Sequence, residues 1–199
     1  MRIAVLALQG AFAEHERMLQ QLGAECFEIR QQADWLRPKD GLPLPGGEST
    51  VHQRLLDRLN LLAPIRHDIL SGLPVFGTCA GLILLAKQES GLPRQHGLAT
   101  MDVDVCRNAY GRQLGSFVAR GSVEGIGTDV PMNFIRAPYV NKVLSPGVEV
   151  LAEVGGRIVA VRQGHQLATA FHPEVSGDVR VHEYFLAMCS LAEKASLFC

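Results

Sequence analysis

The sequence has little of what a disulfide-rich or zinc-binding protein requires. Its 199 residues include five cysteines, an odd number, and no two of them form a Cys-x-x-Cys pair. This pattern argues against a disulfide framework and a zinc site, and it favours a reducing compartment. We therefore expect a cytoplasmic protein that needs no metal.

The usual signals for nucleic acids and membranes are also missing. The net charge is −1 and no run of five basic residues occurs, so the chain has no electrostatic footprint for a nucleic acid. No stretch approaches the roughly 18 apolar residues that span a bilayer. Residues 1–8 are apolar but lack the long apolar region and cleavage site of a signal peptide. We expect neither a nucleic acid nor a membrane among its partners.

What the chain does have is the composition of an ordinary globular protein. Hydrophobic residues make up 47% of it and charged residues 20%, which is too apolar for a disordered chain. The length suffices for one sizeable core, and no repeat, low-complexity run or linker divides it. We expect a single domain over residues 1–199.

The first half of the chain alternates short apolar runs with segments of helical spacing. Pro43 is unfavourable in the strand expected over residues 41–44, because a proline cannot donate a ladder hydrogen bond. The alternation predicts an α/β fold with three layers, a mostly parallel open sheet flanked by helices. We expect strands over residues 2–8, 25–29 and 41–44, helices over 12–22, 51–60 and 64–70, and a strand, turn and helix over 73–88.

The second half changes character and predicts additional antiparallel strands. Gly155-Gly156 is typical of a two-residue hairpin turn. A last helix is expected over residues 178–193. The strands are expected over residues 99–106, 116–119, 132–135, 148–154, 157–163 and 167–171.

One short segment carries most of the chemistry. An apolar strand runs into Gly77-x-Cys79-x-Gly81, and an apolar helix follows at once. This is the nucleophile-elbow pattern with cysteine in the place of serine, and small residues on either side permit the sharp turn. The thiol would lie at a helix N-terminus, where unpaired N–H groups favour the thiolate. The alternative is a buried cysteine in a glycine-containing loop.

A cysteine nucleophile needs a base, and the base needs an acceptor that orients it. Among seven histidines, His172 stands out because it follows an apolar strand directly, as Cys79 does. Both would then lie at the carboxyl edge of the sheet, where α/β folds bind ligands. The Glu174 carboxylate could accept a hydrogen bond from the ring nitrogen that lies opposite the sulfur. The alternative is that His172 and Glu174 are solvated at the end of a strand. The other histidines, among them His15, His52 and His182, are expected to be solvated or simply hydrogen-bonded.

The segment Pro45-Gly46-Gly47-Glu48-Ser49-Thr50 follows another strand at the same edge. Paired glycines let backbone amides approach a ligand, and with the amide of Ala80 they could form an oxyanion hole. The alternative is that Ser49 or Thr50 is a helix N-cap, and this interpretation is compatible with an oxyanion hole. No Gly-Lys-Ser/Thr follows, so this is not a Walker-type phosphate loop.

With these segments the chain resembles the class I, or triad, glutamine amidotransferases over nearly its whole length. That resemblance implies their flavodoxin-like fold. The elbow and His172-Pro173-Glu174 are shared across that class. Further matching segments make the chain similar to the glutaminase subunits of pyridoxal 5′-phosphate synthase. One is Leu8-Gln9-Gly10 with Glu14-His15, and the more specific ones are residues 44–50, Arg107-Asn108 with Tyr110-Gly111-Arg112-Gln113, and residues 134–138.

The resemblance implies a role for each matching residue. Cys79 would be the nucleophile, with His172 and Glu174 as its relay partners. Gly47 and Ala80 would form the oxyanion hole, which the Gly46–Gly47 region completes when a partner docks near Gln9 and Gly10. Glutamine would be bound by Gly47, Glu48, Ser49, Arg107, Ile135 and Arg136. Positions that depart from the expected pattern are Pro43, Gly115 and His52-Gln53, and none of them touches the triad.

The same resemblance implies hydrolysis of L-glutamine to glutamate and ammonia through a Cys79 thioester, with no cofactor. The ammonia would pass to a (β/α)₈-barrel synthase subunit in a hetero-oligomer, which builds pyridoxal 5′-phosphate from ribose 5-phosphate and glyceraldehyde 3-phosphate. Two alternatives stay open. One is a glutaminase serving another pathway, such as imidazole glycerol phosphate synthesis, and the other is a non-catalytic stress or interaction protein with an elbow cysteine.

Overall fold

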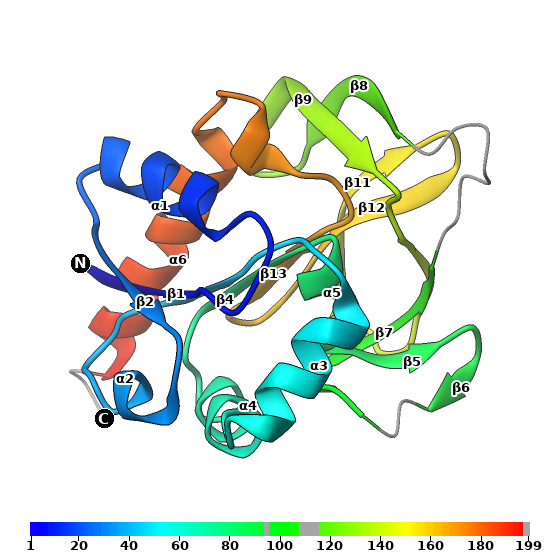
Figure 1. Cartoon of the computed structure of the whole chain (residues 1–199). Coiled ribbons are helices and arrows are strands. Elements are labelled where there is room, and N and C mark those ends of the chain that lie inside the picture. Colours follow the sequence, from blue (N-terminus) through cyan, green and yellow to red (C-terminus); the bar gives the residue numbers. More distant parts are fainter. Residues whose placement is uncertain (94–95, 108–115, 197–199) are drawn as a thin grey trace.

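The computed structural model describes residues 1–93, 96–107 and 116–196. Parallel strands form one part of its sheet (Figure 1): β1 (Arg2–Leu6), β2 (Glu25–Ile29), β3 (Leu42–Leu44), β4 (Val75–Thr78) and β13 (Gln166–Thr169). β2 pairs with β1, while β3 and β13 flank β4. Most of these residues are buried, which accounts for their mainly apolar composition.

Pro43 limits the pairing between β1 and β3. Leu42 donates its N–H to the carbonyl of Pro74 on the β4 side at 2.9 Å, so the nitrogen of Pro43 faces β1. That nitrogen cannot donate. Within the described residues, β1 meets the segment entering β3 at a single bridge, between Ile3 and Gly41.

Helices cover both faces of the sheet. They are α1 (Phe12–Gln21), α2 (Gln32–Trp35), α3 (Ser49–Arg58), α4 (Leu62–Leu70), α5 (Ala80–Leu85) and α6 (Arg180–Ser196). The ring of Phe76 in β4 packs against His15 of α1 and Phe185 of α6. The next residue, Gly77, faces the opposite way, where a side chain would collide with Leu85 of α5. The predicted three-layer α/β architecture is confirmed.

The second half extends the sheet with mixed and antiparallel strands. Beyond β13 follow β12 (Arg157–Gln163), β10 (Tyr139–Val143), β7 (Met101–Cys106), β5 (Ala86–Glu89) and β6 (Leu92–Pro93), while β11 (Glu149–Val154) pairs with β12. Gly155 and Gly156, with φ of +58° and +72°, form the predicted hairpin turn between β11 and β12. A separate antiparallel ribbon, β8 (Ser116–Val123) and β9 (Gly127–Ile135), is longer than predicted.

The prediction of one helix running to residue 88 was wrong. The helix ends at Leu85, and Ala86–Glu89 becomes β5, which pairs in parallel with β7. The carbonyls of Leu84 and Leu85 accept hydrogen bonds from the N–H groups of residues 98–100, so tertiary pairing overrides the helical pattern. The sequence also did not indicate α2, β6, β10 or the short 3₁₀ helix η1 (Pro173–Val175).

Three parallel strands end level with one another, and this arrangement positions the candidate site. Leu44 of β3 lies beside Gly77, and Thr169 of β13 lies beside Thr78. The glycine loop therefore follows β3, Cys79 follows β4, and the segment that contains His172 follows β13. This is the edge at which open α/β sheets bind ligands.

Some expectations fall outside what the structure describes. Asn108, residues 110–113 and Gly115 lie there, as does Cys199. Among the residues that are described, no helix has the length and apolar character needed to cross a bilayer.

Candidate active site

Cys79, His172 and Glu174 come together at the carboxyl edge of the sheet. The ring of His172 is hydrogen-bonded to Glu174 and shares a cavity with the Cys79 thiol. Its Nδ1 lies 2.7 Å from Oε1 of Glu174, so Nδ1–H donates to the carboxylate and Nε2 faces the sulfur. The backbone N–H of His172 donates to the carbonyl of Asn133 at 2.8 Å. The order of nucleophile, base and orienting acceptor is that of a catalytic triad.

The pKa values of the two ionisable partners are shifted in opposite directions. Burial by itself would lower the pKa of His172, but the hydrogen bonds to Cys79 and Glu174, together with their charges, raise it to about 10. Burial would raise the pKa of Glu174, yet His15 and His172 lower it. At neutral pH the ring is protonated and the carboxylate ionised. Opposed shifts of this kind are typical of functional sites.

The backbone at Cys79 is strained. Its φ is +49° and its ψ −97°, a conformation that residues other than glycine rarely adopt. The turn is sharp enough that a side chain at Gly81 would collide with the carbonyl of Leu44. The thiol lies 3.8 Å from the carbonyl oxygen of Ile135, to which it donates. The elbow expected from the sequence is therefore present.

A cavity of about 500 Å³ opens onto the thiol. Its lining residues are Gly47, Glu48, Ser49, Cys79, Ile83, Arg107, Ile135, Arg136 and His172. All six residues that the resemblance implied for glutamine thus share one cavity with the thiol and the imidazole. Ala80 is buried as the first residue of α5, and Glu174 lies behind the ring. Ile83 was not predicted, although its position four residues after Cys79 on the elbow helix places it on the same face.

The family model of the SNO glutamine amidotransferase family matches residues 5–191. The chain belongs to this family. The pyridoxal 5′-phosphate synthase subunit PdxT of Streptococcus pneumoniae is 54% identical over 192 residues, which cover 95% of this chain and 98% of that protein. The predicted enzyme class, a glutaminase of the glutamine amidotransferases, is confirmed.

Solved structures agree with the family assignment. A crystal structure of a glutamine amidotransferase superposes with a TM-score of 0.88 and 44% identity, covering 94% of this chain and 98% of that one. PurLQS from Thermotoga maritima has a TM-score of 0.67 at 18% identity, covering 94% of this chain and 97% of its own, and supports the fold alone.

Ion pairs line the mouth of the amidotransferase pocket. The Arg107 guanidinium lies 3.4 Å from Oε1 of Glu48 and 3.6 Å from Oε1 of Glu89. These side chains are partly solvated, so the pairs are weak and can open. Arg136, with φ of +46°, is a second strained residue of the lining. The mouth therefore holds charged groups of both signs.

The glycine loop of this amidotransferase is fixed from behind. The N–H of Gly46 donates to Oγ1 of Thr78 at 3.0 Å, and its carbonyl accepts from Ala11 at 3.2 Å. A side chain at Gly46 would collide with the ring of His172. The side chain of Gln9 donates to the carbonyl of Glu48 and accepts from its N–H, at 3.1 and 3.3 Å.

The structure corrects one sequence-based expectation in this region and decides a second. The N-cap of α3 is Glu48, whose carboxylate accepts from the N–H of Thr50, so the cap is neither Ser49 nor Thr50. Of the two possibilities expected for His15, His52 and His182, solvated or hydrogen-bonded, the structure shows the second, because all three are fully buried and hydrogen-bonded. The stripe of apolar positions on α1 that includes His15 could have indicated its burial, because a histidine in such a stripe faces the core.

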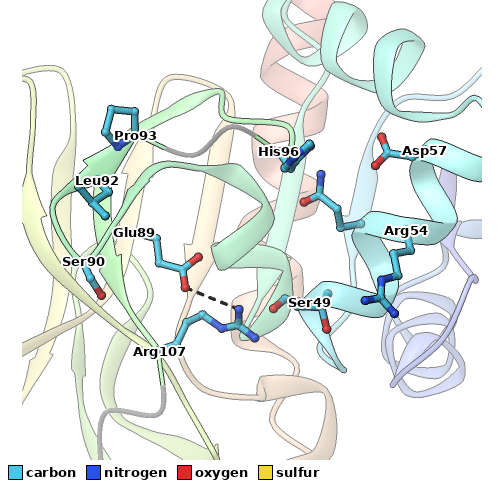
Figure 2. Close-up of a pocket in the computed structure, with 11 residues that line it drawn as sticks. Ser49, Arg54, Asp57, Glu89, Ser90, Leu92, Pro93, His96 and Arg107 are labelled. Carbon is cyan, nitrogen blue, oxygen red and sulfur yellow. Dashed lines mark ion pairs between the residues drawn. The ribbon is translucent and has the colours of Figure 1, made fainter.

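A larger cavity, of about 700 Å³, adjoins the site. Figure 2 shows it between Arg54 and Asp57 of α3 and the hairpin that carries Glu89, Leu92 and Pro93. Arg107 and Ser49 line both cavities. None of its lining residues is a cysteine, so of these two cavities the smaller one contains the Cys79 thiol.

Proposed function

We propose that this chain, acting as one domain in the cytoplasm, is the glutaminase subunit of a pyridoxal 5′-phosphate synthase, with Cys79, His172 and Glu174 as its catalytic residues. One observation carries the proposal. The thiol, the protonated imidazole and every residue expected to bind glutamine line the same cavity, and Glu174 holds the imidazole from behind.

The geometry supports a two-step hydrolysis. The Cys79 thiolate attacks the carboxamide carbon of glutamine, and the carbonyl π electrons move onto oxygen. As the tetrahedral intermediate collapses, the C–N bond breaks and His172 Nε2–H protonates the leaving nitrogen. Ammonia departs and a γ-glutamyl thioester remains. Nε2 then takes a proton from water, whose oxygen attacks the thioester, and glutamate and the thiolate are released.

Glutamine is bound in this proposal by the charged mouth of the pocket. Its α-carboxylate pairs with a guanidinium, for which Arg107 is placed, and its ammonium is accepted by Glu48. In the structure these two side chains pair with each other. The substrate therefore exchanges one weak ion pair for two, with Ser49, Ile135 and Arg136 completing the walls.

The oxyanion is assigned to the backbone amides of Gly47 and Ala80. Ala80 directly follows the nucleophile, and Gly47 lines the cavity. The N–H and carbonyl of Gly46 are already engaged by Thr78 and Ala11. The loop is therefore held by the protein up to the peptide that faces the substrate. Each such donor typically contributes about 10²–10³ in rate.

The ammonia is proposed to pass to a (β/α)₈-barrel synthase subunit in a hetero-oligomer. The name carried by the 54%-identical relatives, pyridoxal 5′-phosphate synthase subunit PdxT, supports this pathway over imidazole glycerol phosphate synthesis. The assembled triad argues against a non-catalytic elbow-cysteine protein, because such a protein has no need of the hydrogen bond between His172 and Glu174.

The test is a glutaminase assay with and without the barrel subunit encoded by the same genome. We expect that subunit to stimulate glutamine hydrolysis, and Cys79→Ala to lower kcat by at least about 10³-fold because the nucleophile is lost. The barrel subunit of imidazole glycerol phosphate synthase serves as the control and should not stimulate. Full hydrolysis by Cys79→Ala in the complex would refute the mechanism.

A further inference from the structure

A second histidine lies directly behind the triad. His15 is completely buried, and its Nε2 is 3.6 Å from Oε2 of Glu174. This oxygen is the one that His172 does not use, and it has no hydrogen-bond partner among the described residues. The same Nε2 is 3.2 Å from Oγ1 of Thr78, and Nδ1 is 3.0 Å from Nε2 of His182.

The charge of Glu174 determines which nitrogen of His15 carries the hydrogen. A bare lone pair on Nε2 would face the carboxylate oxygen and be repelled by it, whereas an N–H there is attracted. His15 therefore carries its hydrogen on Nε2, and its Nδ1 accepts from Nε2–H of His182. His182 therefore donates to His15, and the N–H of His15 points toward Thr78 and Glu174.

Thr78 connects this row to the glycine loop. Its Oγ1 accepts both from the ring of His15 and from the N–H of Gly46, at 3.2 and 3.0 Å. Gly46 in turn packs against the ring of His172. One buried imidazole thus contacts the acidic member of the triad and, through a single hydroxyl, the loop that faces the substrate.

We propose that His15 is a positioning residue for the glutaminase reaction, orienting Glu174 and fixing the glycine loop through Thr78. The proposal rests on the glutaminase function proposed above. His15 touches neither substrate nor thiol, so it acts only through these two neighbours. Its contribution is geometric: it holds the carboxylate in line with Nδ1 of His172 and the loop against the catalytic ring.

A neutral ring suits this role. Burial lowers the pKa of His15, although the nearby Glu174 opposes the shift, and burial lowers the pKa of His182 to about 3. An uncharged His15 does not compete with the His172 imidazolium for the carboxylate. The groups that face this network are His172, Cys79 and Glu174 at the sheet edge, Glu14 on α1 and His182 on α6.

The test compares variants of the full chain, saturated with its barrel partner. His15→Phe keeps a ring but removes both nitrogens, and we expect kcat to fall about 10- to 100-fold with KM nearly unchanged. The alkaline limb of the kcat–pH profile should move to lower pH, because a poorly held Glu174 supports the His172 imidazolium less well. Met18→Ala, a buried change on the same helix without a hydrogen bond, is the control for lost packing and should leave kcat and the profile unchanged.

Two conservative variants keep the test decisive if His15→Phe does not fold. Gln at position 15 can place an amide near the position of Nε2, whereas Asn places one near Nδ1. We expect His15→Gln to keep most of the activity and His15→Asn to lose about 10- to 100-fold in kcat, as expected for His15→Phe. Equal kcat and identical pH profiles for these two variants would overturn the proposal. Absence of glutaminase activity in the unmodified complex would instead overturn the proposed function.

Discussion

The back wall and the mouth of this site use similar charges in opposite environments. Behind the thiol, the side chains of Glu174 and His15 are 0% exposed, and the carboxylate is 2.7 Å from the His172 ring. At the mouth, the side chain of Glu48 is 56% exposed and that of Arg107 30%, at 3.4 Å from each other. A charge loses much more by being unpaired in the buried wall than in the solvated mouth. The wall is therefore built for fixed geometry and the mouth for exchange of partners.

The largest effect should come from removing the buried charge. Glu174→Gln keeps the shape but loses the carboxylate, and we expect kcat to fall by about 10³–10⁴-fold, as for loss of the acid in other triads. KM should change little because the substrate does not touch this residue. Steady-state kinetics of the complex measures both, with far-UV circular dichroism as the folding control. A loss below tenfold would mean that the back wall matters no more than the mouth.

Two histidines of the wall should make stability depend on pH in opposite directions. Burial lowers the pKa of His182 to about 3, so the unfolded chain binds the extra proton and stability falls as pH drops from about 6.5 toward 3. The hydrogen bonds to Cys79 and Glu174 outweigh burial and raise the pKa of His172 to about 10. The folded chain therefore holds that extra proton, and stability falls as pH rises from about 6.5 toward 10. Each slope is at most about 1.4 kcal/mol per pH unit.

Urea unfolding across this pH range checks the two slopes. His182→Gln should flatten the acid side alone, and His172→Gln the alkaline side alone. If both variants kept the pH dependence of the unmodified chain, these histidines would not be the titrating groups.

The smallest effects belong to the mouth. Glu89→Gln removes one partly exposed partner of Arg107 at 3.6 Å, and we expect KM for glutamine to change by no more than about threefold, since solvated ion pairs contribute little. Arg107→Ala should raise KM by about tenfold and leave kcat within a few-fold. Both effects should shrink at high salt. A large fall in kcat for Glu89→Gln would erase the distinction between the two regions.

The sequence was informative about this site wherever its residues follow strand ends. Cys79 and His172 could be paired from the sequence because parallel strands share a carboxyl edge, and the small residues around Cys79 specified the elbow. The mouth residues came from the family resemblance, since nothing in the spacing of Arg107 or Arg136 indicates an amino acid. The resemblance could extend to Arg107 and Arg136 because the segments that contain them match the pattern of the family.

Features that depend on distant packing could not be predicted. His15 meets Glu174 only because α1 and η1 pack at the same sheet edge from opposite ends of the chain, and its spacing showed a helix face without showing what that face covers. The end of α5 is a second example. The apolar pattern predicts a helix beyond Leu85, but residues 86–89 pair with β7 and join the sheet. Non-local pairing decides such boundaries.

The most direct measurement is mass spectrometry of the complex, acid-quenched during turnover of glutamine. A γ-glutamyl adduct confined to the peptide that contains Cys79, and absent from Cys79→Ala, is the predicted result. Steady hydrolysis with no adduct on that peptide, or an adduct on Cys26, Cys106 or Cys189 instead, would contradict the mechanism.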